Sequence, residues 1–470
     1  MPSLNTKILI WKAKTSSEKL ALKLIEILKK SGFIKTYIVG GYVRDLFLKR
    51  KETGAIDLAS EARPEQVTAI LRRKGFSVIP TGLKHGTVTV HKNGLDVEIT
   101  TFRKEGKYPD FRRPEKVSYI KDPAADSSRR DFTINALYFD PKKSEVTDYQ
   151  GGISDLSKKV LRFVGSAATR IYEDPLRLMR AVRFATVLGF KLSQKDQKII
   201  KRNSALISKI SAERVKAELD KIMLSQNRSS GLRLLREISI LKQVLPEVEL
   251  LAKTRQSKNY HSEGDVFTHT LLGLSKIEKS ADLKTLYGLL FHDAGKAQTL
   301  QWIKKHGRSH STFYGHQQVG EELAKKAMKR LRFSKAEITD IAWYVKNHHV
   351  PYELSKMRKS KQMGWCLDPR FENLLKLYRA DSLSSIPTDA KGKKLKPSLK
   401  SYNFSTETLK AAKSKKVLRQ KIVSGNDVMK ILKIGAGPEV GRVLNQLRDL
   451  QLGGKIKTKK EALEYLKKNS

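Results

Sequence analysis

A glycine turn and a carboxylate in the first sixty residues have the types and spacing of a site for phosphate and metal. An apolar run ends at Gly40 and Gly41, a helix is expected to follow at 42–48, and Asp57 lies in the next apolar stretch. Paired glycines let the backbone approach a ligand closely, and helix N-termini attract phosphate. Arg44 adds positive charge in the first turn of that helix. Asp57 is placed to hold a metal ion against the phosphate.

A second carboxylate, Glu98, lies on the expected strand 95–101. The residues of this strand alternate, so Asp96 and Glu98 share one face. Two carboxylates on one strand face often do no more than face the solvent. Glu98 becomes a stronger candidate metal ligand only if its strand lies beside the strand of Asp57. Position 55, two residues before Asp57 and on the same strand face, is alanine.

Arginine is concentrated in two later segments. Arg129 and Arg130 precede Asp131, where a helix is expected to open at 129–136. Paired arginines are usually a solvated face, but beside a phosphate site they are candidate triphosphate clamps.

The second of these segments starts at Asp174 and Pro175, which have the pattern of a helix N-cap followed by a first-turn proline. Arg177, Arg180 and Arg183 follow at every third residue, so together with Asp174 they form one polar stripe. On spacing alone, a capped helix with a basic outer face is the favoured interpretation.

Histidine is concentrated later in the chain. Eight of the ten histidines fall between residues 261 and 349, and His292 and Asp293 are adjacent at the end of an apolar helix expected at 286–291. Isolated histidines are usually structural. Imidazole and carboxylate groups gathered on helices suit a catalytic divalent metal with open coordination positions. The sequence therefore predicts a second site, separate from the first.

The composition limits the class of protein. At 470 residues the chain is long enough for several domains, and its 94 basic and 48 acidic side chains give a net charge of +46. This charge favours a nucleic-acid partner. The single cysteine, Cys366, excludes a disulfide framework and a thiolate zinc cluster. No signal-peptide core or membrane-length apolar run is present, so we expect a soluble, cytoplasmic protein with no membrane partner.

Periodicity and turn residues predict the elements that position these groups. Helices are expected at 16–32, at 64–74 and through much of 190–250, and strands at 76–79, 87–91 and 95–101, with a turn at Asn93-Gly94. A mobile loop is expected at 102–127 and a linker or exposed arm at 386–416. Near Gly435–Pro438 we expect a helix N-terminus that could meet RNA backbone phosphate.

Four motifs in this order resemble those of the bacterial class II tRNA nucleotidyltransferases (CCA-adding enzymes) and the related bacterial poly(A) polymerases. They are the glycine turn with Arg44 and the segments 98–103, 129–136 and 173–177. The glycine turn alone is a weak signal, but all four in order are specific. The resemblance covers about residues 36–250 and resumes in an HD-type phosphohydrolase domain and the C-terminal arm.

The resemblance implies an α+β fold, with a small mixed-sheet nucleotidyltransferase palm of the DNA polymerase beta superfamily followed by a largely helical neck, body, HD domain and tail. On this basis we expect a head at 1–140, a neck and body for base recognition and RNA binding at 141–250, an HD-type metal phosphohydrolase domain at 251–390, and a basic RNA-binding tail at 391–470.

The resemblance also implies roles for the residues of the first site. The triphosphate would be held by Gly41 and Arg44, with Gly40 in the same turn. Asp57 and Glu98 would be two of three carboxylates that bind Mg²⁺. Arg130 and Asp131 would contact the triphosphate and the ribose.

Asp174 and Arg177 resemble the amino-acid template with which this family reads the incoming base. Arginine donors can meet acceptors on cytosine or adenine, while a carboxylate accepts from the exocyclic amine. Uracil and guanine present an N–H donor to the arginine, so they are disfavoured. Arg180 and Arg183 would continue the stripe towards the phosphates. The resemblance therefore replaces the interpretation as a basic outer face.

The implied reaction is attack of a tRNA 3′-hydroxyl on the α-phosphate of CTP or ATP, with release of pyrophosphate and two Mg²⁺ ions as cofactors. The segment 81–87 and the long loop at 102–127 favour CCA addition over poly(A) synthesis, which stays as an alternative.

Ala55 departs from the family pattern, which has Asp-x-Asp where this chain has Ala55-Ile56-Asp57. Loss of one carboxylate should sharply weaken metal binding and cost orders of magnitude in rate. An engineered inactive form and a natural enzyme that has lost activity both fit. Asp45 and Glu52 are not obvious substitutes.

In the HD-type domain, the resemblance implies a divalent metal of unspecified identity and phosphatase or phosphodiesterase activity on nucleotide or RNA ends. The matching ligands are His269, His292, Asp293 and Asp381, with His316 and His348 as candidate ligands of a second metal. Two further classes stay open: a non-catalytic RNA-binding relative, and a phosphohydrolase that uses only this domain.

Overall fold

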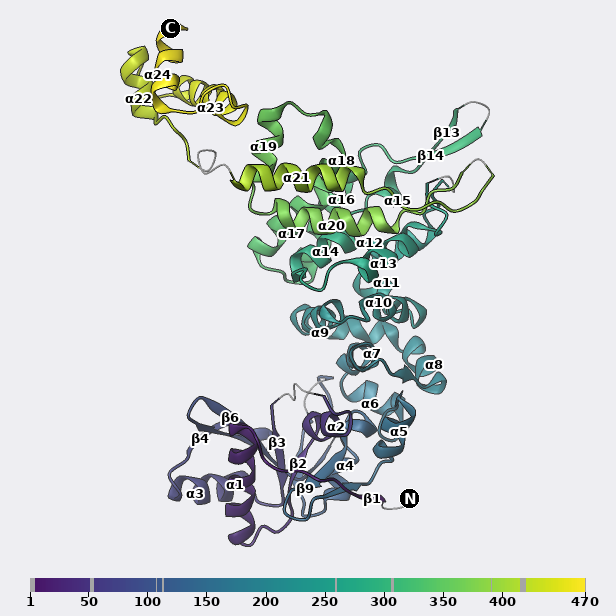
Figure 1. Ribbon diagram of the computed structural model, residues 1–470. Helices are drawn as coiled ribbons and strands as arrows, with labels where there is room; N and C mark the ends of the chain where they lie inside the picture. The colour runs from purple at the N-terminus through teal and green to yellow at the C-terminus, as the bar shows by residue number, and fades with distance from the viewer. Residues whose placement is uncertain are drawn as a thin grey trace. The chain divides into compact units, whose positions relative to one another are not determined.

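The computed structural model describes residues 5–50, 55–106, 108–111, 114–257, 260–305, 308–389, 391–414 and 420–469, without the side chains of residues 81, 84 and 304–310. The chain divides into two compact units, Met1–Val244 and Leu245–Ser470. The first contains a mixed sheet and helices, and the second is almost entirely helical (Figure 1). The predicted α+β fold class is confirmed.

An eight-stranded mixed sheet organises the first unit, in the order β1-β10-β9-β2-β3-β6-β5-β4. Only β3 and β6 are parallel neighbours among these described strands, and the other pairs are antiparallel. The strands are β1 Asn5–Ile8, β2 Thr36–Val39, β3 Asp57–Ser60, β4 Ser77–Gly82, β5 Thr87–Lys92, β6 Leu95–Thr101, β9 Leu137–Asp140 and β10 Glu145–Asp148.

Local sequence explains the elements around this sheet. Helix α1 starts with a capping box between Thr15 and Glu18, and its apolar stripe is buried. Asn93 and Gly94 both have positive φ, as a two-residue hairpin turn between β5 and β6 requires. The helices α1 (Ser16–Lys30) and α3 (Pro64–Arg73) lie side by side against the sheet, and α2 (Gly41–Phe47) connects β2 to β3 (Figure 1).

The rest of the first unit is mainly helical. Its elements are β7 Arg103–Glu105, β8 Val117–Tyr119, α4 Pro123–Ser127, α5 Gly152–Lys158, β11 Val160–Leu161, α6 Ala167–Glu173, α7 Leu176–Leu188, β12 Lys191–Leu192, α8 Gln194–Arg202, α9 Ala212–Leu224, α10 Arg228–Glu237 and α11 Leu241–Val244, with 3-10 turns at Leu83–His85, Thr133–Asn135 and Ser204–Lys209.

Two expectations for this unit were wrong. The segment 129–136 opens no α-helix: it forms a 3-10 turn, Thr133–Asn135, that leads into β9. Phe132 and Ile134 are fully buried here, and tertiary packing overrides the helical pattern. The described part of 102–127 is more ordered than a mobile loop, because β7 and β8 pair with each other and α4 follows them.

The second unit consists of helices and one hairpin. Its elements are α12 Pro246–Glu249, α13 Val266–Lys276, α14 Leu283–Phe291, α15 Lys296–Thr299, β13 Gln301–Lys305, β14 Arg308–Thr312, α16 His316–Arg330, α17 Lys335–Asn347, α18 Val350–Glu353, α19 Lys359–Leu367, α20 Phe371–Ser384, α21 Lys400–Ser414, α22 Gly425–Leu432, α23 Pro438–Leu452 and α24 Lys459–Lys468, with 3-10 turns at Leu250–Lys253 and Leu354–Lys356.

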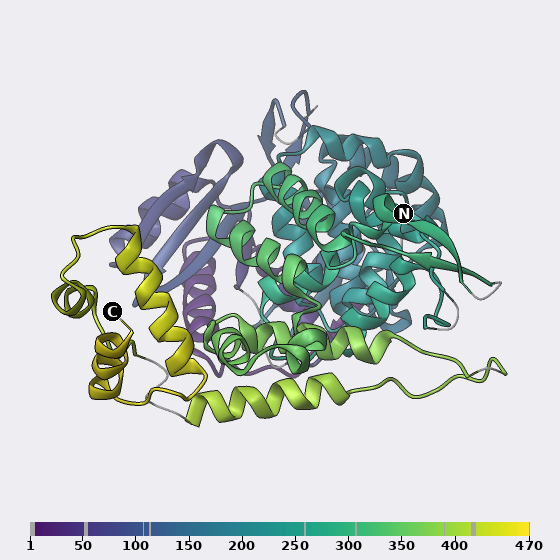
Figure 2. The same cartoon turned by 90° about the horizontal axis from the view of Figure 1, so that it is seen from above.

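The expected linker at 386–416 is partly wrong. Its second half contains the 15-residue helix α21, the yellow-green helix along the lower edge of Figure 2. This helix packs on α19 and α20 and buries Leu409 and Ala412. Residues 415 and 416 lie outside the described part. Among the described residues, no helix is both long and apolar enough to cross a membrane.

Candidate functional site

The glycine turn lies against a carboxylate and a guanidinium group. Gly40 has φ 77° and precedes α2. A Cβ at this position would lie 3.6 Å from Asp57 Oδ2 and 3.8 Å from Arg130 Nη1. These would be ordinary contacts, so glycine is needed here for its backbone conformation. The turn, Asp57 and Arg130 all line one open cavity of about 620 Å³.

The two predicted metal carboxylates lie side by side. The parallel pairing of β3 and β6 sets Asp57 directly opposite Glu98, so the condition for Glu98 as a metal ligand is met. Burial, together with the charge of Glu98, raises the pKa of Asp57 to about 6, although Arg130 acts in the opposite direction. A carboxylate such as Asp57, whose ionisation is opposed by a neighbouring carboxylate, forms a site that favours a cation.

Asp57→Asn is expected to stabilise the metal-free protein at pH 8 by about 2 kcal/mol and to have almost no effect at pH 4. The folded-state pKa of about 6 exceeds the ordinary 3.8, so ionised Asp57 costs stability above pH 6. The cost fades as pH falls towards 3.8. The full shift would correspond to about 3 kcal/mol, which we reduce because the side chain is partly exposed.

Urea unfolding at both pH values in EDTA measures this difference. Asp96→Asn is the matched control, because Asp96 lies on the neighbouring strand β6 with its side chain 65% exposed. An equal gain for the two variants, or a gain at pH 4, would contradict the explanation.

Arg44 lines the cavity and is held there by three hydrogen bonds. Its Nε and Nη2 donate to Asp45 at 3.0 and 2.8 Å, and its Nη1 donates to Asn135 Oδ1 at 2.9 Å. Asp45 is thereby engaged as the ion-pair partner of Arg44. Glu52 lies outside the described residues.

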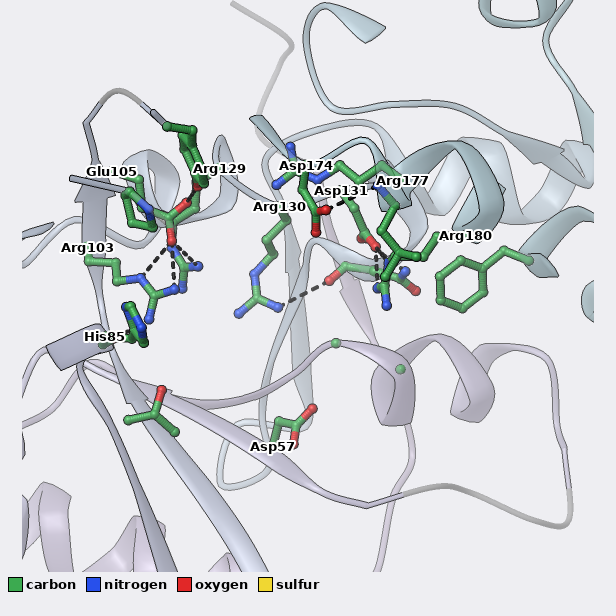
Figure 3. Close-up of a pocket in the computed structure, with 18 of the residues that line it drawn as sticks. Asp57, His85, Arg103, Glu105, Arg129, Arg130, Asp131, Asp174, Arg177 and Arg180 are labelled. Atoms are coloured by element: carbon green, nitrogen blue, oxygen red, sulfur yellow. Dashed lines mark hydrogen bonds and ion pairs between the residues drawn. The ribbon is translucent and has the colours of Figure 1, made fainter. Parts of the chain in front are cut away.

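Arg130 and Asp131 face the cavity from the turn before β9 (Figure 3). Arg130 donates through Nε to Tyr138 at 3.2 Å. Asp131 accepts from Arg180, from Asn135 and from the backbone N–H of Phe132. Burial would raise the pKa of Asp131, but these donors, led by Arg180, hold it at about 2. Asp131 is thus a fixed anion that orients Arg180.

Asp174 and Arg177 lie together on the same cavity wall. Asp174 Oδ1 accepts from the backbone N–H of Leu176 at 3.1 Å, and its Oδ2 accepts from Arg214 at 2.9 Å. Arg177 donates to the carbonyl of Arg170 at 2.8 Å and to the Glu173 carboxylate. These partners fix a carboxylate acceptor and a guanidinium donor side by side, as reading of a base edge requires.

Some details of this wall differ from the sequence-based expectation. Pro175 is the N-cap of α7, so Asp174 precedes the cap by one residue, although its side chain still accepts a backbone N–H of the first turn. Arg183 is not among the residues that line the cavity. It pairs with Glu218 of α9 and stacks on Phe184, with its guanidinium carbon 3.8 Å from the ring centroid.

The expected set of site residues omitted part of the cavity. Arg214 comes from α9, about forty residues after its partner Asp174, and no local pattern links the two. A second charged cluster occupies the opposite side of the cavity (Figure 3). It consists of His85, Arg103, Glu105, Tyr108 and Arg129. Arg103 and Glu105 lie in the segment that we expected to be a mobile loop.

In the second unit, six of the predicted metal ligands come together from the helices α13, α16 and α20 and from the turns that follow α14 and α17. His269 Nε2 lies 2.8 Å and His292 Nε2 lies 3.4 Å from Asp381 Oδ1. His316 Nε2 and His348 Nε2 lie 3.7 and 3.9 Å from Asp293 Oδ1. The clustering expected from sequence is therefore found.

The tautomers in this cluster are set by the backbone. His292, His316 and His348 each place Nδ1 2.7 Å from the carbonyl three residues earlier, so Nδ1 carries the proton and Nε2 faces the cluster. Burial lowers the pKa of His316 to about 4, which keeps its imidazole neutral. His292 Nε2 and Asp293 Oδ2 make close ion contacts but no well-directed hydrogen bond. Such an arrangement fits a metal ion.

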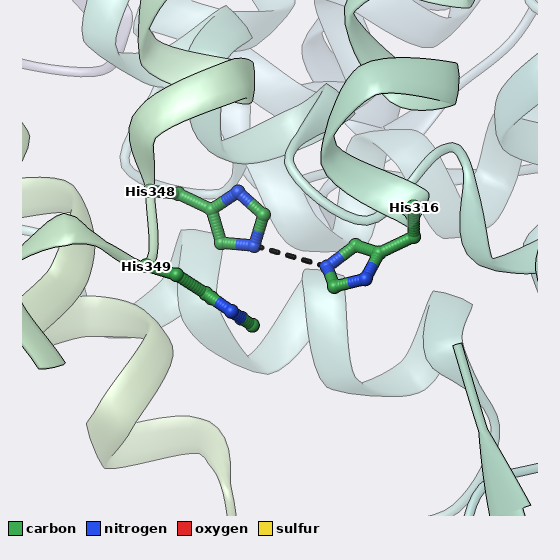
Figure 4. Close-up of side chains that lie close together, drawn as sticks. All are labelled: His316, His348 and His349. Atoms are coloured by element: carbon green, nitrogen blue, oxygen red, sulfur yellow. Dashed lines mark hydrogen bonds between the residues drawn. The ribbon is translucent and has the colours of Figure 1, made fainter. Parts of the chain in front are cut away.

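Three further residues that no motif singled out adjoin this cluster. His349 lies beside His316 and His348 (Figure 4). Glu263 accepts from both His261, at 2.7 Å, and His269, at 2.9 Å. Glu263 thus orients the imidazole of His269, which faces the cluster. The sequence did not reveal this role, because Glu263 lies far from His292 along the chain.

Comparison with family models identifies three domains. Residues 36–162 match the poly A polymerase head domain, residues 189–251 match the probable RNA and SrmB-binding site of polymerase A, and residues 266–386 match the HD domain. The Bacillus stearothermophilus CCA-adding enzyme in complex with CTP superposes with a TM-score of 0.68 over 97% of this chain and 98% of that one, at 24% identity. The chain has the fold of the CCA-adding enzymes.

Other relatives agree. The Thermotoga maritima CCA-adding enzyme complexed with tRNA has a TM-score of 0.63, at 17% identity over 99% of both chains. The CCA-adding enzyme of Anoxybacillus flavithermus is 42% identical over 228 residues, which are 48% of this chain and 55% of the relative. That of Lactobacillus delbrueckii subsp. bulgaricus is 44% identical over 207 residues, 44% of this chain and 50% of the relative. The chain thus spans about half the length of the curated relatives it matches. The resemblance inferred from the motifs is confirmed.

Proposed function

We propose that the chain is a tRNA nucleotidyltransferase that adds or repairs the 3′-terminal CCA of tRNA with CTP and ATP, without a nucleic-acid template. One observation carries the proposal: a single cavity joins the glycine turn and Asp57 to Asp174 and Arg177. Phosphate, metal and base-edge chemistry therefore meet in one place. The relatives named above, which include CTP and tRNA complexes, support the choice of substrates.

In this proposal each group has a role that follows from its position. Gly41 and Arg44 hold the triphosphate, with Gly40 giving the turn its close approach. Arg130, Asp131 and Arg180 are the charged side chains that contact the nucleotide between its phosphates and its sugar. Asp174 and Arg177 select the base. Asp57 and Glu98 hold Mg²⁺, which when bound activates the RNA 3′-hydroxyl and stabilises the charge on the departing pyrophosphate.

We further propose the division expected from sequence: a head at 1–140, a base-reading and RNA-binding neck and body at 141–250, a metal-binding HD domain at 251–390, and a basic RNA-binding tail at 391–470. Its partners would be the acceptor arm and 3′ end of tRNA in the cytoplasm. The net charge of +46 supports a polyanionic partner.

The test is extension of a tRNA transcript that lacks CCA, with CTP, ATP and Mg²⁺, by this chain and by Ala55→Asp. Addition of CCA by the restored protein supports the proposal. A long A tail with no use of CTP would instead identify a poly(A) polymerase. Salt-sensitive tRNA binding without extension, even after restoration, would identify a non-catalytic RNA-binding relative.

We propose a second function for the HD domain, divalent-metal hydrolysis of phosphate esters at nucleotide or RNA ends. The observation that favours it is the convergence of imidazole Nε2 atoms on Asp293 and Asp381 described above. Next to them opens a cavity of about 490 Å³, and Lys296, 2.7 Å from Asp293, lines it where a phosphate would be held.

Asp293→Asn is expected to weaken binding of Mn²⁺ to this domain by at least about 100-fold, because it removes the shared carboxylate of the cluster. Titration calorimetry measures it, with Asp57→Asn as the background so that the head does not contribute. His91→Ala, an exposed histidine of the head, is the control. Hydrolysis of 2′,3′-cyclic nucleotides should be lost in parallel. Unchanged Mn²⁺ affinity would refute the assignment of Asp293 as a ligand.

A further inference from the structure

A second, shallower cleft of about 590 Å³ adjoins the nucleotide cavity of the first unit. One wall comes from the β7–β8 connection, with Gly106, Tyr108 and Phe111. The other comes from α6, with Tyr172 and its neighbours. Tyr108 lines both this cleft and the nucleotide cavity, so the two are adjacent. We refer to it as the aromatic cleft.

The aromatic cleft is poorly suited to phosphate. Among the described residues that line it, the only charged side chain is Glu173. Glu173 is an anion that already pairs with Arg170 at 2.9 Å and with Arg177. The remaining lining is aromatic or small, and Tyr172 is 54% exposed. An exposed aromatic ring in a basic protein is suited to stacking with a nucleobase.

We propose that the aromatic cleft binds the unpaired 3′-terminal base of the acceptor RNA by stacking on Tyr172 and Phe111. This inference rests on the proposed transferase function and adds to it a binding site for the terminal base of the second substrate, the acceptor RNA. The backbone of Phe111 supports a dedicated role, because its φ of 55° is uncommon for a bulky residue.

The position of the aromatic cleft beside the nucleotide cavity argues for this occupant. Transfer requires the RNA terminus to reach the phosphate bound near Asp57, while its base needs a surface outside the part of the cavity claimed by Asp174 and Arg177. The aromatic cleft begins beside Glu173, one residue from that base-reading wall. Stacking tolerates any base, as a protein that meets different terminal bases during successive additions requires.

The test uses a tRNA-like minihelix with 2-aminopurine as its 3′-terminal base, mixed with the full chain in the absence of nucleotide. Stacking should quench the fluorescence of 2-aminopurine. Tyr172→Ala and Phe111→Ala should each abolish the quenching and weaken binding roughly 5- to 100-fold. Tyr172→Phe, which keeps the ring, should preserve both. Tyr352→Ala is the control, because that tyrosine of the second unit is 53% exposed and should change neither.

The outcomes separate this inference from the transferase proposal. Tight minihelix binding with quenching unaffected by Tyr172→Ala and Phe111→Ala would overturn the aromatic cleft as the base site. Quenching only when 2-aminopurine is placed one nucleotide further in would overturn it as well. If the minihelix does not bind and the Ala55→Asp protein extends nothing, the transferase proposal fails, and the inference fails with it.

Discussion

Ala55→Asp is expected to raise the rate of nucleotide addition by at least about 10³-fold, which corresponds to about 4 kcal/mol of transition-state stabilisation. Ala55 is exposed and stands two residues before Asp57, which already lies opposite Glu98. Asp57 and Glu98 alone would supply few oxygen ligands to divalent metal, and Asp at position 55 would add a third carboxylate donor. We therefore expect Ala55→Asp to strengthen metal binding, and the rate to rise as a consequence.

Single-turnover extension across a range of Mg²⁺ concentrations measures this change. The half-saturating Mg²⁺ concentration should fall in Ala55→Asp, and Ala55→Asn, which has nearly the same shape but no charge, should gain little. Adding Asp57→Asn to Ala55→Asp should remove the gain. If Ala55→Asn recovers activity as well as Ala55→Asp, the missing group is not a metal ligand.

The central elements of the head could be predicted because local rules and packing agree there. The glycine turn, the Asn93-Gly94 hairpin and the capping box of α1 each require particular residues at fixed spacing. The sequence alone left the role of Glu98 conditional, because the pairing of β3 with β6 spans about forty residues. Only the sheet order resolves that condition.

Other features could not be predicted because their causes are distant in sequence. Arg214 enters the site through its ion pair with Asp174, a contact between different helices. The segment 129–136 has helix-compatible residues, yet Phe132 packs on Phe163 and Phe184 and forces a turn. The lysine-rich composition before α21 resembles a linker, and its helical continuation depends on packing against α19 and α20.

Asp174→Asn is expected to reduce the preference for CTP over UTP by about 100-fold, with most of the loss coming from improved use of UTP. The Asp174 carboxylate accepts hydrogen bonds only, so it favours the exocyclic amine of cytosine and opposes the O4 carbonyl of uracil. An amide can present its NH₂ group to that carbonyl. Arg214 and the backbone N–H of Leu176 already occupy defined positions on the carboxylate, so the side chain has little freedom to avoid the mismatch.

Steady-state values of kcat/KM for CTP, ATP, UTP and GTP, all in the Ala55→Asp background, measure this selectivity. Asp220→Asn is the matched control, because it also replaces a carboxylate by an amide, but on α9. There Asp220 pairs with Lys216 at 2.8 Å and does not line the cavity. Its selectivity should stay unchanged. Arg177→Ala should lower kcat/KM for CTP and ATP together, because the donor that both bases share is lost. If Asp174→Asn slows all four nucleotides equally, Asp174 shapes the cavity without reading the base, and selectivity must come from another wall.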